Sequence, residues 1–128
     1  MFKGEDYNDG IFFHYYKNYS FSAGGISSTL QDLQSFFNHL YTKETFLKKE
    51  TRDMMMATEG EYGLGIEKFT LNINNGEQIF YGHGGDNFSY KLRNWYNPIT
   101  GQLIIVFSNH YRDPFTSKIV GQILKAVN

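Results

Sequence analysis

The chain of 128 residues has the length of one domain, and a chain of this size buries roughly two-thirds of its unfolded surface. Its formal net charge of −1 comes from scattered acids and bases, so there is no basic field to attract nucleic acid. The longest apolar run, Leu103 to Phe107, is far too short to span a membrane. We therefore expect one globular domain over residues 1–128, with no nucleic-acid partner and no membrane span.

The lack of cysteine excludes disulfides and thiolate metal sites, and it selects no compartment because many exported bacterial proteins also lack disulfides. No two of the four histidines are spaced like zinc ligands on one element, so we expect no metal site. No cofactor is expected either. The first residues lack the basic and apolar regions of a signal peptide.

Aromatic residues make up 18% of the chain, from 12 Phe, 10 Tyr and one Trp, which is a high share. Such an excess suggests a face that another segment normally covers, or self-association of the isolated domain. One aromatic cluster, at residues 11–16, lacks a clean period and predicts an extended or irregular segment.

Three stretches predict helices. Residues 29–41 have an apolar stripe at helical spacing, and Ser28 with Gln31 has the form of a capping box. Residues 49–56 carry acids in their early turns. Asp113 followed by Pro114 is typical of a helix start. The expected buried stripes are Leu30, Leu33, Phe37, Leu40 and Tyr41 in the first helix, and Ile119, Ile123, Leu124 and Val127 in the last.

Several stretches between the helices have strand character. Asn75-Gly76 favours a type I′ hairpin turn, and residues 97–101 form a second turn signal. The continuously apolar residues 103–107 suit an interior strand that is covered on both faces. The expected strands are residues 62–66, 71–73, 78–81, 90–96 and 103–107. The fold class is α+β: an antiparallel meander of about four strands with helices packed on its faces.

Residues 81–90 are the stretch that most resembles a site. Three glycines surround His83, and glycine lets another backbone, such as a bound peptide or acyl group, approach closely. The plainer interpretation is a glycine-rich hairpin loop with an incidental histidine. In an antiparallel meander the end of one strand, the start of the next and the end of the third share one edge. We therefore expect His83, Ser89 and Asn109-His110 to lie on one rim and to flank one ligand.

Four stretches together resemble the C-terminal part of the serine β-lactamase and penicillin-binding-protein family, which includes D-alanyl-D-alanine carboxypeptidases and esterases. They follow the family's order: a Gly-Gly and Ser-Thr helix entry, a Tyr-Gly-Leu-Gly strand, the His-Gly-Gly form of its Lys-Thr-Gly strand, and its last strand. In this chain they are Ser22 to Leu33, Tyr62 to Ile66, Gly82 to Gly85 and Leu103 to Asn109. The resemblance runs from about Ser22 to the C-terminus, well under half of a complete family member.

The resemblance implies roles for the residues after Gly82. His83 takes the place of a lysine that orients the substrate's carboxylate or assists proton transfer, and Gly84 and Gly85 keep the strand edge open for substrate. The residue after the second glycine lends its backbone N–H to an oxyanion hole. Here that residue is Asp86, whose carboxylate must face away from the hole or oppose the developing charge.

The family's nucleophile lies in a Ser-x-x-Lys turn, and no serine here has a lysine three residues later. The first hypothesis is therefore the C-terminal portion of a β-lactamase-like serine hydrolase, inactive alone and completed by an N-terminal part. The alternative is a non-catalytic module that binds a peptide or glycan. A third is a free-standing hydrolase that uses His83 with Ser89 or Ser108.

Overall fold

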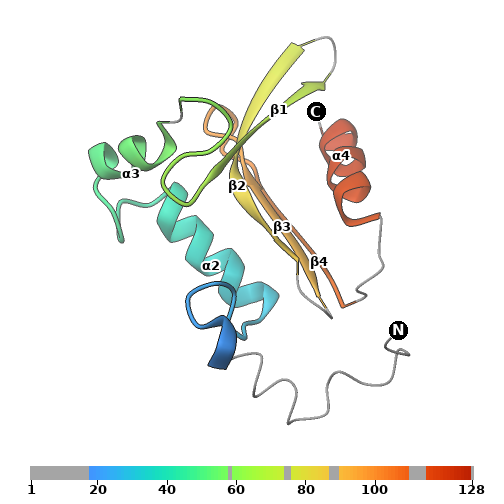
Figure 1. Cartoon of the computed structure of the whole chain (residues 1–128). Helices are drawn as coiled ribbons and strands as arrows, with labels where there is room; N and C mark the ends of the chain where they lie inside the picture. The colour runs from blue at the N-terminus through green and yellow to red at the C-terminus, as the bar shows by residue number, and fades with distance from the viewer. Residues whose placement is uncertain (1–17, 58, 74–75, 87–89, 110–114, 128) are drawn as a thin grey trace.

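The computed structural model describes residues 18–57, 59–73, 76–86, 90–109 and 115–127. Four antiparallel strands form one sheet with helices on both of its faces, so the α+β meander predicted from the sequence is confirmed (Figure 1). The elements are α2 (Leu30–Tyr41), α3 (Lys49–Met56), β1 (Glu67–Ile73), β2 (Gly76–Asp86), β3 (Lys91–Tyr96), β4 (Leu103–Ser108) and α4 (Phe115–Val127). Residues 11–16, the Asp113-Pro114 cap, Ser89 and His110 lie outside the described residues.

The strand order in the sheet is the order in the chain, β1-β2-β3-β4. Strand β2 runs through the glycines to Asp86 and pairs with β3, so the expectation of a loop at these glycines was wrong. Ile73 pairs with Gly76, so Gly76 lies in β2 and not at the centre of the turn. A strand that continues through glycine is held by pairing with its neighbours, because glycine itself weakens strands.

Each face of the sheet carries its own core. On one face, α4 contributes Val120 and Leu124, which pack against buried residues of the strands. On the other face, α2 and α3 cover the sheet around Tyr41 and Tyr96, whose rings stack with centroids 4.9 Å apart. Figure 1 shows α4 on one side of the sheet, with α2 and α3 on the other. The α4-face core is Ile73, Phe80, Trp95, Val120 and Leu124, and the α2-face core is Tyr41, Ile66 and Tyr96.

Helix α2 starts one residue later than its capping signal predicted. Thr29 is the N-cap: its hydroxyl oxygen accepts from the backbone N–H of Asp32 at 3.1 Å and donates to the Asp32 carboxylate at 2.9 Å. The acid in the first turn also suits the positive end of the helix. Arg52 of α3 donates to the carbonyl of Tyr41 at 2.8 Å, which ties α3 to the C-terminal end of α2.

The predicted strand at residues 62–66 is a turn. Only Tyr62 makes a bridge, to Glu67, and the N–H of Gly63 donates to the carbonyl of Ile66 at 2.7 Å. Gly65 has a φ of +71°, a conformation that glycine adopts easily and other residues rarely. The alternating glycines that imitated a strand period are thus turn residues, and β1 begins only at Glu67.

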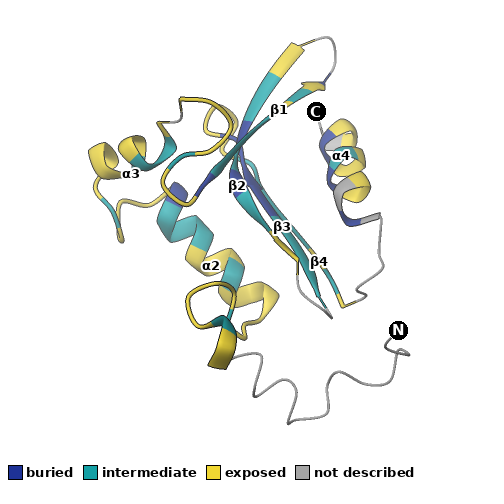
Figure 2. Ribbon diagram, in the orientation of Figure 1, coloured by how far each residue is buried: buried dark blue, intermediate teal, exposed yellow. Residues whose placement is uncertain are grey.

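Strand β4 is not interior, as its apolar sequence predicted, but lies at the edge of the sheet. Helices cover both of its faces, yet residues 103–106 are only half-buried and Phe107 is 52% exposed. In β3, by contrast, the polar Asn94 is 2% exposed. Figure 2 shows that buried residues lie in the inner strands β2 and β3. The most apolar strand of the sheet is therefore less buried than an asparagine in the neighbouring strand.

Two smaller expectations had mixed outcomes. The turn at residues 97–101 is confirmed: the Asn97 side chain accepts from the N–H groups of Ile99 and Thr100, and Gly101 has a φ of +73°. Among the described side chains of α4, Thr116, Val120 and Leu124 are buried, whereas Ile119 and Ile123 are exposed, so the predicted stripe was wrong for those two. Val127, the last residue of that stripe, is not among the described side chains. No helix in the described part of the chain is long and apolar enough to cross a membrane.

Candidate functional site

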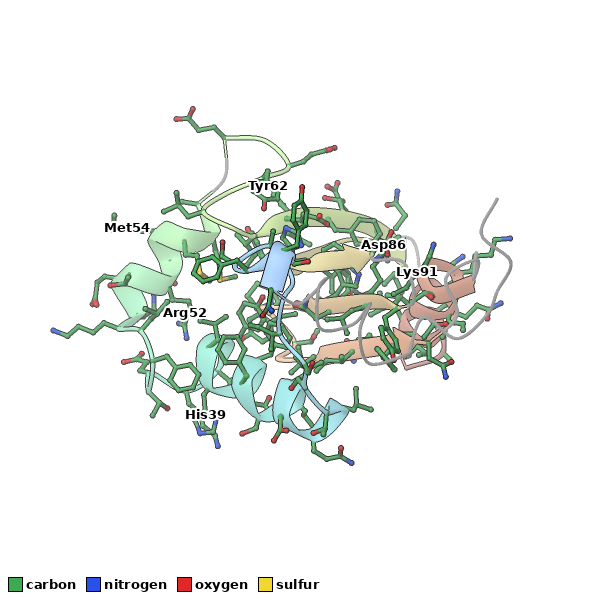
Figure 3. All side chains as sticks on the ribbon, turned by 60° about the horizontal axis from the view of Figure 1, so that its bottom comes forward. His39, Arg52, Met54, Tyr62, Asp86 and Lys91 are labelled. Carbon is green, nitrogen blue, oxygen red and sulfur yellow. The ribbon has the colours of Figure 1, made fainter. Side chains whose placement is uncertain are left out.

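The strand register places the predicted site residues in two rows of the sheet. Asp86 pairs with Lys91, and Lys91 pairs with Ser108, so these three form the rim that Asn109 follows. Figure 3 shows Asp86 beside Lys91 at this end of the sheet. His83 lies three residues further back along β2, about 10 Å from Asp86 at the rise of a strand. The prediction that His83 shares a rim with Asn109 was therefore wrong.

His83 and Asp86 also point to opposite faces of the sheet. Side chains alternate along a strand, and an odd spacing of three reverses the face. His83 pairs with Asn94, which contacts Tyr41 on the α2 face, and Gly85 shares that face. Gly84 pairs with Arg93, and with Asp86 it belongs to the α4 face. The two faces of β2 therefore carry separate polar groups.

Tyr62 is the principal partner of the His83 ring. Its hydroxyl lies 2.8 Å from Nε2 of His83, and the ring planes meet at 81° with centroids 5.6 Å apart. The other ring nitrogen, Nδ1, bonds to the carbonyl of Gly84. Sequence reasoning missed this partner, because Tyr62 is 21 residues away in the chain and had been assigned to a strand. No local pattern would have revealed the contact.

Asn94 anchors the backbone beneath His83. Its Nδ2 donates to the His83 carbonyl at 2.9 Å, and its Oδ1 lies 3.5 Å from the Tyr41 hydroxyl, which donates to it. Burial raises the pKa of Tyr41 above its ordinary value, so this hydroxyl stays protonated and remains a donor. Buried amides with both ends bonded fix geometry. Asn94 therefore joins α2, β2 and β3 at the position next to His83 in the sheet.

On the opposite face, Arg93 holds Asp86 with two hydrogen bonds, from Nη1 to Oδ1 at 2.8 Å and from Nη2 to Oδ2 at 3.1 Å. These bonds lower the pKa of Asp86 and raise that of Arg93. A hollow of about 300 Å³ is lined by Glu67, Gly84, Asp86 and Arg93. The charge of the Asp86 carboxylate is thus balanced by Arg93 on the α4 face, away from the His83 ring.

Strand β2 has a described strand on both sides only at Tyr81 and Gly82. Its pairing with β1 ends at Glu67 and Gly82, whereas its pairing with β3 continues to Asp86. Residues 83–86 therefore have a neighbouring strand on one side only, among the residues that the structure describes. We call this stretch the open edge. His83 and Tyr62 lie at its start, and Gly84 and Gly85 form its middle.

The described residues contain no group of three His, Cys, Asp or Glu side chains that could hold a metal ion. The candidate site consists of a histidine with a tyrosine partner, two glycines and a strand edge that lacks a described neighbour on one side. No protein-family model and no curated protein matches the sequence of the chain.

Proposed function

We propose that this chain is the C-terminal part of a β-lactamase-like serine hydrolase and supplies the His-Gly-Gly strand of its substrate site. The open edge at residues 83–86 is the observation that carries this proposal, because it combines a histidine with backbone that lacks a described strand partner on the side away from β3. An extended ligand can add to such an edge as a further strand, through main-chain hydrogen bonds. The ligand is an acyl compound of the family's kind: a D-alanyl peptide, a β-lactam or an ester.

Within this proposal the nucleophile comes from an N-terminal part that carries Ser-x-x-Lys. Both ring nitrogens of His83 are already bonded, to Tyr62 and to Gly84, so the ring activates no serine in this arrangement. Ser108 lies in the row of Asp86 and not in the row of His83. This argues against a hydrolase in which His83 activates Ser108. Asn109, beyond Ser108, is then a substrate contact only for a ligand that extends along the rim.

The second candidate function is a non-catalytic module that binds a peptide or glycan. The same open edge favours it, since strand addition requires backbone groups and no chemistry. The two functions predict different behaviour for a longer chain that includes the N-terminal part. A hydrolase becomes acylated when the Ser-x-x-Lys segment is present, whereas a binding module does not.

The first experiment is an NMR titration of the ¹⁵N-labelled chain with a peptide that ends in D-alanyl-D-alanine. We expect shifts at the amides of residues 83–86 and at Tyr62, and weaker shifts for His83→Gln. His39→Gln, on α2 and outside the open edge, is the matched control. The 128-residue chain should not be labelled by a fluorescent penicillin, because no serine in the sequence has a lysine three residues later. Shifts confined to other surfaces would contradict the proposed site.

The second arm uses the genomic DNA upstream of the coding region. A reading frame that contains Ser-x-x-Lys should yield a longer chain that fluorescent penicillin labels, and His83→Ala should lower its turnover by roughly 10²- to 10⁴-fold if the ring transfers protons. Peptide binding without labelling of the longer chain would favour the binding module. Stoichiometric labelling of the 128-residue chain alone would overturn the requirement for an added nucleophile.

The same proposal assigns a partner to β4. An apolar edge strand that is covered on both faces, and that has no described strand on the side away from β3, fits pairing with a strand of the missing part. Without that part, self-association through the edge is the expected substitute. This matches the aromatic excess of the chain, which includes exposed rings at Phe36, Phe46 and Phe107.

A further inference from the structure

We propose that Tyr62 is a positioning residue that holds His83 as the neutral Nδ1–H tautomer, with Nε2 as a proton acceptor at the open edge. The inference rests on the proposed function only for the use of that acceptor. The contact between the Tyr62 hydroxyl and His83 is present in the structure whatever the function. It also distinguishes between the two roles that the resemblance leaves open for His83, orientation of a carboxylate and transfer of a proton.

The hydrogen bonds determine the tautomer. Nδ1 bonds to the carbonyl of Gly84, and a carbonyl oxygen only accepts, so Nδ1 carries a proton. In a neutral imidazole the other nitrogen is then an acceptor, and the Tyr62 hydroxyl 2.8 Å away can donate to it. A protonated ring would place two donors there and would force the hydroxyl to reverse. A neutral ring held in this way can accept a proton at Nε2, whereas orientation of a carboxylate would require a protonated ring.

The backbone around Tyr62 fixes the hydroxyl in this position. Tyr62 bridges to Glu67, and the next residue donates to the carbonyl of Ile66 at 2.7 Å. On the other side, the N–H of Lys68 donates to the carbonyl of Glu61 at 2.7 Å. Ile66 is 2% exposed and packs in the α2-face core, so the turn is anchored to the interior. Tyr62 is thus held from both sides although its side chain is 56% exposed.

The exposure of Tyr62 has a consequence for the ligand. The hydroxyl occupies the lone pair of Nε2, so a ligand that adds to the open edge meets the tyrosine before it meets the histidine. Proton transfer from a ligand to His83 then follows one of two routes. Either the hydroxyl turns away and leaves Nε2 free to accept the proton, or the hydroxyl gives its own proton to Nε2 and takes one from the ligand. The Gly84 carbonyl accepts from Nδ1–H and the Tyr62 hydroxyl donates to Nε2, so the two contacts favour the same tautomer.

Long-range ¹H–¹⁵N spectra of the imidazole nitrogens test this directly at pH 8, above the ordinary range of histidine titration. The His83 signals are assigned by their loss in His83→Gln. We expect the native chain to show the Nδ1–H tautomer. In Tyr62→Phe the ratio of Nδ1–H to Nε2–H should fall by about 2- to 10-fold, the range expected for one lost hydrogen bond. Tyr19→Phe, at a highly exposed tyrosine, should leave the ratio unchanged.

Two results would overturn the inference. One is an Nε2–H tautomer in the native chain, which needs no variant to detect. The other is an unchanged ratio in Tyr62→Phe, with an amide spectrum that shows an intact fold. The experiment contains no substrate, so either result would count against Tyr62 and leave the proposed function to the ligand titration. Failure of that titration, in turn, would leave the tautomer result standing.

Discussion

At the scale of single residues, the ion pair of Asp86 and Arg93 decides how this part of β2 responds to pH. Arg93 lowers the pKa of Asp86 below its ordinary value of 3.8, chiefly through hydrogen bonds. A carboxyl group with a lowered pKa in the folded state stabilises the fold above its unfolded pKa. That stabilisation disappears as the pH falls through the lowered value. The Asp86 side chain is half-exposed, so solvent screens the pair and limits its contribution.

We expect Asp86→Asn to lower the free energy of unfolding by about 1 kcal/mol or less at pH 7. The difference from the native chain should shrink as the pH falls below 3.8, where the native carboxyl also becomes neutral. Urea unfolding at a series of pH values measures both. Arg93→Lys is the control, since it keeps the charge but not the two parallel hydrogen bonds. A loss that stays constant down to pH 2 would show that charge is not the cause.

At the scale of elements, the glycines of β2 differ in how much space the neighbouring strand leaves for a side chain. A Cβ on Gly82 would lie 1.8 Å from the carbonyl oxygen of Asn94, in the paired strand. A Cβ on Gly85 would meet only the Cβ of Leu92, at 3.7 Å. The first distance requires the backbones to separate, whereas the second is ordinary contact. Close approach of β2 and β3 thus depends on Gly82, whereas Gly85 has room for a methyl group.

Gly82→Ala should therefore lower the free energy of unfolding by about 1 to 3 kcal/mol, the usual cost of overpacking. Gly85→Ala should cost little, since alanine fits there without a clash. Chemical denaturation of the two variants compares them in one strand. Equal losses in both would mean that strand propensity, and not the contact with Asn94, explains the glycines.

The elements with a clear period were predictable from the sequence, and the contacts between them were not. The helix at residues 49–56 and the strand ending at Tyr96 were confirmed because their patterns are local. Gly63 and Gly65 produced a false strand, because alternation alone does not separate a strand from a turn rich in glycine. His83 was found through its glycines, whereas its face, its row and its bond to Tyr62 depend on a register that no local pattern encodes.

At the scale of the whole molecule, the two edges of the sheet differ in how they are protected. Edge strands commonly carry charges that prevent pairing with another chain. β1 has Glu67 and Lys68, whereas the six residues of β4 include no charged side chain. Helices cover the faces of β4, but in the described structure no strand lies on the side of β4 that faces away from β3. The β4 edge is thus the more exposed template for an added strand.

We expect the isolated chain to form a dimer or larger species in size-exclusion chromatography with light scattering. Phe107→Lys, at an exposed position of β4, should shift the chain toward the monomer, because lysine on an edge strand opposes pairing. Thr70→Lys, at an exposed position of β1 on the opposite edge, should leave the association unchanged. A native chain that is monomeric and binds no hydrophobic dye would count against an uncovered edge.

The agreement between strand order and chain order also shapes how the chain finds its fold. Each pairing in the sheet joins strands that are consecutive in sequence, with only two residues between Ile73 and Gly76. Short loops have a small closure entropy, and topologies rich in local contacts fold faster than those with distant pairings. The α4-face core draws all its residues from Glu67 onward, whereas the hydrogen bond of Tyr41 to Asn94 spans 53 positions. The sheet with α4 can thus form from neighbouring segments of chain. The docking of α2, which adds the bond of Tyr41 to the asparagine that holds the His83 carbonyl, is the step that joins distant parts of the chain.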